Sequence, residues 1–329
     1  MLTKTRSTTT GEAPVPAMRG MADAEQATIE LNQVSKWYGD IVAVSDISFG
    51  VGPGVTGLLG PNGAGKSTTL KMMAGLQAPS SGKVTINDVE MRGKPQAYRD
   101  LGLVSEHEVI YPFLSGRDFV RLNAKLQNLA NVDKAVEKAI SLVDMQSAAD
   151  RKVGGYSKGM RQRIKVAGAL VHDPRVILMD EPLNGTDPVQ RAQLIRLIRE
   201  LGDSGKTVLV SSHVLVEVER FAENIIVIVN GKLAAAGDFR TIREKIDAHD
   251  HEVRIKASDS RKLAAALIGQ TSVQSVRIDA LSRIVASTND VPTFYRMVPM
   301  AAQQQQVRLF EVQATDESLT SVFSYLVEK

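Results

Sequence analysis

The stretch GPNGAGKST, residues 60–68, has the residue types and spacing of a loop that binds phosphate groups. Its fixed positions are Gly60, Gly65, Lys66 and Ser67. Glycine lets backbone N–H groups crowd around phosphate oxygens where side chains would clash, and the helix that follows points its positive end at the anion. We expect Lys66 to reach the β- and γ-phosphates of a nucleotide and the Ser67 hydroxyl to bind Mg²⁺.

A pair of carboxylates, Asp180 and Glu181, follows the apolar run 175–179. Taken alone, such a pair after a strand is usually a solvated loop. Beside a phosphate loop, Asp180 is interpreted as a Mg²⁺ ligand, often through water, and Glu181 as the group that polarises an attacking water.

These residues need strands and helices to bring them together. Residues 55–60, 175–180, 206–212 and 224–230 form near-continuous apolar runs, which is typical of parallel strands covered by helices on both faces. Apolar residues at helical spacing predict a helical insert over about 108–171. The pattern therefore predicts an α/β fold between residues 28 and 246.

The rest of the chain has a different organisation. Residues 1–27 lack periodicity and are predicted to be a disordered tail. Residues 247–329 predict a small α+β domain, strand–helix–strand–strand–helix–strand, of ferredoxin-like type. Its first helix would be capped by Asp259 and its second would cover 293–302, where Pro299 is expected to disturb it. A final amphipathic helix would present Leu319, Val322, Phe323 and Leu326.

Length and composition exclude several classes of protein. The 329 residues suggest about two domains. The longest apolar runs, 225–229 and 263–268, are far shorter than the roughly 20 residues that span a bilayer. No cysteine is present, which excludes disulfides, thiolate metal sites and cysteine nucleophiles. The net charge of +3, without a Lys/Arg cluster, does not favour a partner that is a nucleic acid.

Over residues 29–246 the chain resembles the ATP-binding subunit of an ABC transporter, with a P-loop NTPase domain of ABC type: a parallel-sheet core, an antiparallel β subdomain and a helical insert. Further motifs occur in family order. WYGD puts Tyr38 at the position that stacks on adenine; YSKGMRQR resembles the signature loop; LNGTDP resembles the loop at the dimer interface, with Asp187 in the matching place; and SSH ends at His213, the position of the histidine that senses the γ-phosphate. The implied ATP contacts are Tyr38, Gly60, Pro61, Asn62, Gly63, Ala64, Gly65, Lys66, Ser67 and Thr68, with Glu181, His213 and Lys66 catalytic. The signature residues that act on the partner's ATP would be Ser157, Lys158, Gly159 and Met160, of which Lys158 and Met160 depart from the commonest form.

The resemblance also implies how the subunit works. A homodimer, or a heterodimer with a paralogue, would close around two ATP and drive a separate transmembrane permease, which would hold the subunit at the cytoplasmic face of the cell membrane. The family usually has Gln where this chain has Glu106, and the exporter-type branch tolerates Glu there, so a role for Glu106 with Mg²⁺ or in coupling and a function in export are expected. Residues 110–113 lie where the family docks its permease, or simply pack the helical insert. The alternatives are a non-transport ABC ATPase that acts on ribosomes or DNA, and an interaction protein with an inactive site.

Overall fold

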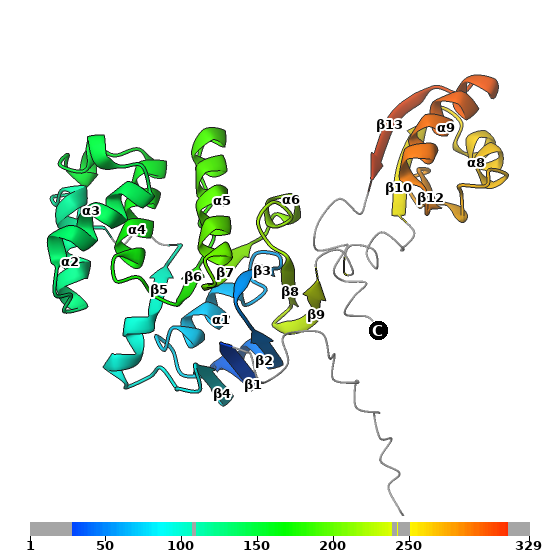
Figure 1. The fold of residues 1–329 in the computed structure, drawn as a ribbon. Coiled ribbons are helices and arrows are strands. Elements are labelled where there is room, and N and C mark those ends of the chain that lie inside the picture. Colours follow the sequence, from blue (N-terminus) through cyan, green and yellow to red (C-terminus); the bar gives the residue numbers. More distant parts are fainter. Residues whose placement is uncertain (1–27, 107–109, 239–241, 243–250, 315–329) are drawn as a thin grey trace, which may run out of the picture.

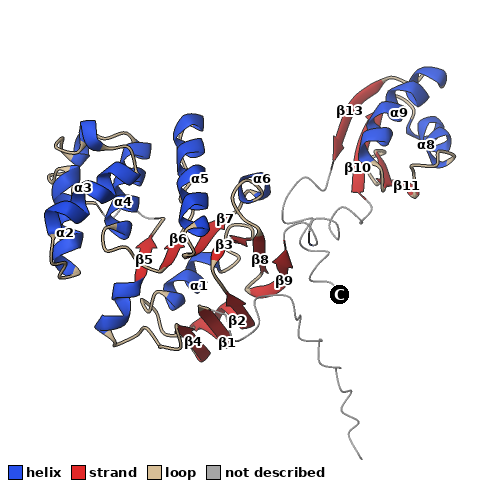
Figure 2. Ribbon diagram, viewed as in Figure 1, coloured by secondary structure: helices blue, strands red, loops and turns tan. Residues whose placement is uncertain are grey.

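The computed structural model describes residues 28–106, 110–238, 242 and 251–314 (Figures 1 and 2). Three sheets organise these residues, two in the first part of the chain and one in the last. The predicted tail at 1–27 and the predicted final helix at 319–326 lie outside the described residues. No helix in the described ranges combines the length and apolar character needed to cross a bilayer.

The larger sheet has six strands in the order β5-β6-β7-β3-β8-β9. Five are parallel, and β9 pairs antiparallel with β8. Their bounds are β3 Gly54–Leu59, β5 Leu101–Val104, β6 Val176–Met179, β7 Thr207–Ser212, β8 Asn224–Val229 and β9 Lys232–Asp238. The four apolar runs of the sequence form β3, β6, β7 and β8, with ends within one residue of the prediction.

Both faces of this sheet are buried, which explains why its strands are apolar throughout. Ile177 and Met179 of β6 face one core cluster, which includes helices of the insert, whereas Val176 and Leu178 face a second cluster. Successive side chains of a strand point to opposite faces, so a strand covered on both sides needs apolar residues at every position. Burial of each large apolar side chain of this kind contributes about 1.5–3 kcal/mol to the free energy of folding.

A three-stranded antiparallel sheet covers the second cluster. Its order is β2-β1-β4, with β1 Ile29–Tyr38, β2 Ile41–Val51 and β4 Ser81–Ile86. Helix α1, Lys66–Met73, packs in the same cluster, and a 3₁₀ turn, Pro95–Asp100, leads into β5. Helix α5, Pro188–Asp203, and the short helix α6, Leu215–Val218, pack on the other face of the large sheet. This is the α/β architecture that the sequence predicts.

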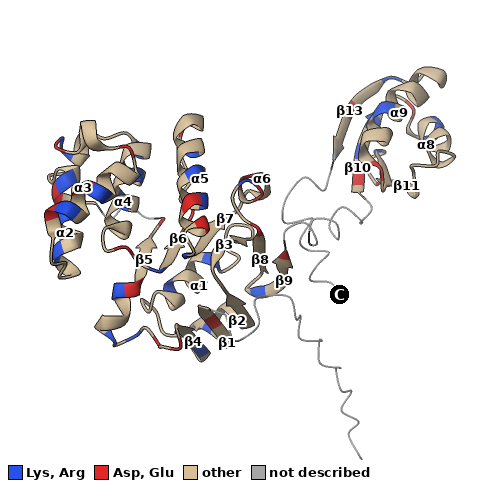
Figure 3. Ribbon diagram, viewed as in Figure 1, with Lys and Arg blue, Asp and Glu red and all other residues tan. Residues whose placement is uncertain are grey.

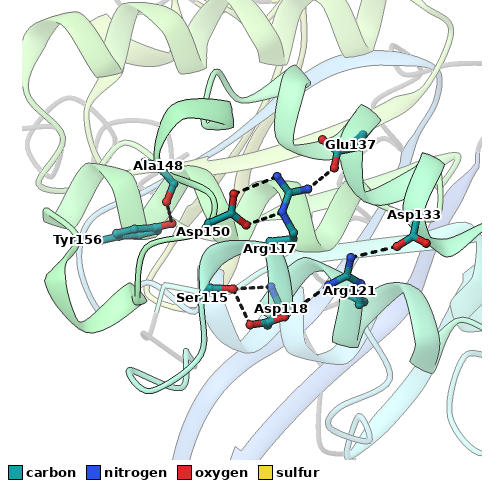
Figure 4. A network of polar contacts seen from close by, with 9 residues as sticks. All are labelled: Ser115, Arg117, Asp118, Arg121, Asp133, Glu137, Ala148, Asp150 and Tyr156. Carbon is teal, nitrogen blue, oxygen red and sulfur yellow. Dashed lines mark hydrogen bonds and ion pairs between the residues drawn. The ribbon is translucent and has the colours of Figure 1, made fainter.

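The helical insert contains α2 Gly116–Leu126, α3 Val132–Leu142 and α4 Lys158–Leu170. Each begins at a side chain that accepts a hydrogen bond from a backbone N–H of the first turn: Ser115, Asn131 and Ser157. A polar network ties the helices together (Figure 4). Arg117 of α2 pairs with Glu137 of α3 and, at 2.7 Å, with Asp150 in the segment that leads towards α4. The Tyr156 hydroxyl, two residues before α4, donates to the oxygen of Ala148 at 2.6 Å, so the network extends from α2 to the residues that lead into α4.

The last part of the chain forms a four-stranded antiparallel sheet in the order β11-β12-β10-β13 with two helices. The elements are β10 His251–Ala257, α8 Ser260–Ile268, β11 Ser275–Ile278, β12 Ile284–Thr288, α9 Val291–Gln304 and β13 Leu309–Ala314. This is the predicted order of elements, and the sheet places the first and third strands at its centre, as a ferredoxin-like split βαβ unit requires. Asp259 caps α8 as expected.

The prediction for α9 was wrong in one respect. The helix runs without interruption from Val291 to Gln304, although Pro299 lies inside it. Pro299 removes one hydrogen-bond donor, but the face formed by Phe294, Val298 and Ala302 is buried in the core of this unit. Tertiary packing outweighs the local cost of the proline. Figure 3 shows basic and acidic positions interspersed along both parts of the chain.

Candidate functional site

Three neighbouring parallel strands end at one edge of the large sheet, and each delivers part of the site. The phosphate loop, residues 60–68, follows β3; Asp180 and Glu181 follow β6; and His213 follows β7. The order β6-β7-β3 makes these ends adjacent. The carboxyl ends of parallel strands are where α/β sheets bind ligands.

The phosphate loop has the backbone that its glycines predict. Gly65 has a φ of +103°, and a Cβ there would lie 2.5 Å from the backbone oxygen of Ala43. A Cβ at Gly60 would lie 2.1 Å from the backbone oxygen of Ile228. Neither position can carry a side chain without moving a neighbouring backbone. Gly65 is also the residue at which α1 begins, so the loop leads directly into a helix N-terminus.

Lys66 is buried and lies across the loop. Its Nζ donates to the backbone oxygens of Gly60, at 2.8 Å, and Pro61, at 3.1 Å. The same Nζ lies 3.3 Å from Oε1 of Glu181, which is also buried. In a buried pair of this kind each charge offsets part of the other's lost hydration, so loss of either group would leave the other buried without a partner charge.

Glu181 lies at the centre of the site. Its Oε2 lies 2.9 Å from Nδ1 of His213, and its backbone has a φ of +46°, unusual for a residue with a side chain. Apart from its ion pair with Lys66, Oε1 makes no hydrogen bond among the described residues. A strained backbone and a buried carboxylate oxygen whose one contact is an ion pair are typical of functional positions, where a ligand completes the set of contacts.

Ser211 links the Asp180 carboxylate to the backbone of Glu181, and the sequence reasoning did not single it out. Its hydroxyl donates to Oδ1 of Asp180 at 2.7 Å and accepts from the backbone N–H of Glu181 at 2.8 Å. The backbone N–H of Asp180 donates to the oxygen of Val104 on β5 at 2.8 Å. The sequence signal was the hydroxyl two residues before His213, near the end of a predicted strand.

A cavity of about 380 Å³ opens between these groups. Of the predicted site residues, those that line it are Asn62, Gly63, Ala64, Gly65, Lys66, Ser67, Thr68, Glu106, Glu181 and His213, joined by Ala43 and Asn184. Ala43 and Asn184 were not predicted. Glu106 is exposed and follows the end of β5, so it stands at the cavity from a fourth strand end.

Tyr38 is not among the residues that line the cavity. It is the last residue of β1 and is 44% exposed. Its hydroxyl bonds to the Gln77 side chain, and Nζ of Lys36 lies 5.1 Å from its ring centroid. The hydrogen bond to Gln77 therefore orients the Tyr38 ring. Part of the side chain stays exposed and could stack on a planar ligand.

The signature loop, residues 157–160, and Asp187 also do not line the cavity of their own chain. Ser157 caps α4 by accepting from the N–H of Met160 at 3.2 Å, and Asp187 caps α5 by accepting from the N–H of Gln190 at 2.9 Å. The two loops contact each other, because the Lys158 ammonium lies against Gly185. They form a second group of residues, in which Ser157, Lys158 and Asp187 are exposed and Gly159 is buried.

Chemically, the first group of residues combines an anion-binding loop, a buried lysine and a carboxylate held by a histidine. The loop and Lys66 suit a triphosphate, whose charge they offset, and Glu181 suits a group that receives or orients a proton of water. These are the requirements of nucleotide triphosphate hydrolysis.

Comparison with known proteins agrees with this reading. Residues 44–184 match the family described as ABC transporter. The ABC transporter ATP-binding protein YhcH of Bacillus subtilis is 33% identical over 305 residues, covering 91% of this chain and 95% of that protein. The Nod factor export ATP-binding protein I of Cupriavidus metallidurans is 37% identical over 216 residues, covering 64% of this chain and 71% of the relative.

Solved structures agree as well. The ATP-binding subunit of an ABC transporter aligns with a TM-score of 0.61 at 28% identity, covering 66% of this chain and 92% of the other. A dimeric ATP-binding cassette in a post-hydrolysis state, bound to ADP and Pi, aligns with a TM-score of 0.60 at 26% identity, covering 64% of this chain and 99% of the other. The alternative of a non-transport ABC ATPase is not favoured by these relatives. The chain belongs to the family of ABC transporter ATP-binding proteins, as an ATP-binding and ATP-hydrolysing subunit.

Proposed function

We propose that the chain works as a dimer with two composite ATP sites and drives a separate membrane permease in export. Each site would combine the phosphate half of one subunit with the signature half of its partner. The observation that carries the proposal is the convergence of Lys66, Glu181 and His213 on a single cavity beside the phosphate loop.

In the phosphate half, the backbone N–H groups of residues 60–68 and the Lys66 ammonium would hold the β- and γ-phosphates. Glu181 would orient and deprotonate the attacking water, and His213 would hold the Glu181 carboxylate in place, as its 2.9 Å contact supports. Tyr38 would stack on the adenine with its exposed ring face. ATP binding then draws on both the loop and the antiparallel sheet.

The residues also fit a divalent cation. Ser67 lines the cavity. Asp180 is buried and does not line it, but it directly precedes Glu181, which does. Mg²⁺ held by Ser67 and Asp180, with Glu106 as a further ligand, would supply neutralisation of phosphate charge. Removal of Mg²⁺ with a chelator should stop hydrolysis, and added Mg²⁺ should restore it.

In the signature half, the exposed N-terminus of α4 would face the γ-phosphate bound by the partner subunit. Ser157 and Gly159 would contact that phosphate, with Lys158 and Met160 beside them and Asp187 at the dimer interface. The start of a helix favours anions, which supports this assignment. ATP would therefore favour the closed dimer, and its hydrolysis would release it.

The permease would dock beside the helical insert. Ile110 packs against the core, while Tyr111 and Phe113 are exposed, with ring centroids 5.7 Å apart. An exposed aromatic pair of this kind suits a protein partner. Through this contact the subunit would lie at the inner face of the cell membrane, and the export-named relatives support transport in that direction.

The proposed division of the chain assigns residues 28–246 to the nucleotide-binding domain and 247–329 to an accessory domain. The test of the whole proposal is co-purification of a multi-span permease with the full chain. Replacing Tyr111 and Phe113 with serine should abolish that co-purification and leave the ATP affinity unchanged. Retention of the permease by this double variant would place the docking surface elsewhere.

A further inference from the structure

The end of β5 is held from two sides. β5 is an edge strand of the large sheet, so within the described part of the chain no strand pairs with its outer backbone groups. On the inner side, the N–H of Asp180 donates to the oxygen of Val104 at 2.8 Å. On the other side, Nζ of Lys165 donates to the oxygen of Ser105 at 2.7 Å and lies 3.5 Å from the oxygen of Glu106.

Lys165 is an unusual residue for its position. It lies in the middle of α4 and is only 8% exposed. Lysine is rarely buried unless its ammonium group has partners, because the loss of hydration is costly. The contact with the end of β5 gives this buried ammonium group backbone oxygens as partners, which an apolar side chain of the same length could not use.

The contact joins two parts of the proposed ATP site. Glu106, one residue beyond Ser105, lines the nucleotide cavity. Helix α4 begins after Ser157, the signature residue, and Lys165 lies eight residues later, about 12 Å along the helix axis. One side chain therefore connects the helix of the signature half to the backbone that carries Glu106.

We propose that Lys165 is a positioning residue for ATP hydrolysis, which holds the backbone of residues 105–106 so that the Glu106 carboxylate faces the bound nucleotide and its cation. The proposal rests on the role given to Glu106 above. Lys165 does not touch the substrate; it acts through Glu106.

The test is a double-mutant cycle in the full-length chain with Lys165→Met, Glu106→Ala and the double variant. Lys165→Met keeps the length and most of the volume of the side chain but removes the donor. It should lower kcat about fivefold to tenfold, as a misplaced catalytic group does, and change KM for ATP less than twofold, because the phosphate loop is untouched. The double variant should match Glu106→Ala within a factor of two.

Arg163→Met is the matched control. Arg163 lies on the same helix and also donates to two backbone oxygens, those of Val143 and Asp144, at 3.4 Å, but within the helical insert. Its effect on kcat should multiply with that of Glu106→Ala. Lys165→Gln, which retains a shorter donor, should give a kcat between those of the wild type and Lys165→Met, with a melting temperature close to that of the wild type.

The outcomes separate the two levels of the argument. If Glu106→Ala lowers kcat and Lys165→Met multiplies with it, Lys165 acts on the fold in general and the positioning proposal is wrong. If Glu106→Ala leaves kcat unchanged, the role proposed for Glu106 fails and the Lys165 proposal fails with it. If the effects of Lys165→Met and Glu106→Ala on kcat are non-additive, while those of Arg163→Met and Glu106→Ala are additive, the results support the roles of both Glu106 and Lys165.

Discussion

The two halves of the proposed ATP site are built differently. In the phosphate half, Lys66, Glu181 and His213 are connected to one another by contacts of 2.9–3.3 Å at adjacent strand ends. In the signature half, Ser157 and Asp187 are exposed and use their side-chain oxygens to cap their own helices. The residues of the phosphate half are held together by contacts within one chain. Those of the signature half do not line the cavity of their own chain, so a role in ATP binding would require a partner subunit.

This difference teaches where preorganisation is needed. Chemistry requires fixed charges in a site shielded from water, which buried strand ends provide. A surface that must meet and leave a partner with each ATP must instead stay exposed, and its helix caps keep it folded in the meantime. Substitutions should therefore fall into two classes, which the predictions below separate.

Lys66→Ala should have the largest effect. It removes the ammonium group that offsets phosphate charge, so phosphate release from ATP should fall at least ~100-fold. Lys71→Ala is the control, since Lys71 lies on the same helix but does not line the cavity. Full turnover by Lys66→Ala would remove the basis for the assigned phosphate half.

Ser157→Asp separates the halves more sharply. Aspartate caps a helix as well as serine does, so the melting temperature should be kept, but its charge would repel the partner's γ-phosphate and lower hydrolysis about 10–100-fold. Binding of ATP to the phosphate half should not change. Asn131→Asp makes a comparable exchange at the cap of α3 and should leave hydrolysis intact. Equal activity of the two variants would contradict an in-trans role for Ser157.

Tyr38→Ala should weaken ATP binding about fivefold to 150-fold, because stacking of a base on an aromatic ring contributes roughly 1–3 kcal/mol. Trp37, the only tryptophan, neighbours Tyr38, and its fluorescence should report the titration with Mg-ATP. Phe310→Ala, at an exposed aromatic of the last sheet, should bind ATP as the wild type does. A Trp37 signal that ATP does not alter in the wild type would count against the position assigned to Tyr38.

Tyr156→Phe should have the smallest effect, on stability. The Tyr156 hydroxyl donates to the oxygen of Ala148 at 2.6 Å, so its loss should lower the free energy of unfolding by about 0.5–1.5 kcal/mol. Burial raises the pKa of Tyr156 above its ordinary value of about 10. The folded state thus favours the protonated hydroxyl, and this stability is present below pH 10 and lost as the pH rises beyond it.

Denaturant titrations at pH 8 and above pH 10 measure how the contribution of the Tyr156 hydroxyl to the free energy of unfolding changes with pH. The difference in stability between wild type and Tyr156→Phe should shrink at the higher pH, because only the wild type loses the contribution of the neutral hydroxyl. Tyr111→Phe, at an exposed ring, should change stability by less than about 0.5 kcal/mol at either pH. A difference in stability between the wild type and Tyr156→Phe that grows with pH would contradict a raised pKa of Tyr156 in the folded state.

Much of the fold and of the phosphate half could be predicted from the sequence, because the signals are local. The glycines and Lys66 lie within nine residues, and the strands that end at Asp180 and His213 are continuous apolar runs. Local patterns also predicted the N-cap of α8, Asp259, and the order of elements in the last unit. A motif made of a few consecutive residues can be recognised without knowledge of the fold.

What escaped prediction depends on contacts between distant residues. Ser211 meets Asp180 across 31 positions, and Lys165 meets Ser105 across 60. No local pattern records such pairs, since they arise when strands and helices pack. The second helix of the last unit was predicted over 293–302, but its uninterrupted course through Pro299 was not. Burial of its apolar face, not the preference of one residue, decides its extent.

The claim that the two halves meet only across a dimer is tested most directly by size-exclusion chromatography of Glu181→Gln with Mg-ATP. This variant keeps the shape of the side chain but removes the proposed base, so ATP should stay bound and the chain should elute at twice its mass. Adding Ser157→Asp should return it to the monomer position. Elution of Glu181→Gln as a monomer with ATP bound would contradict the account.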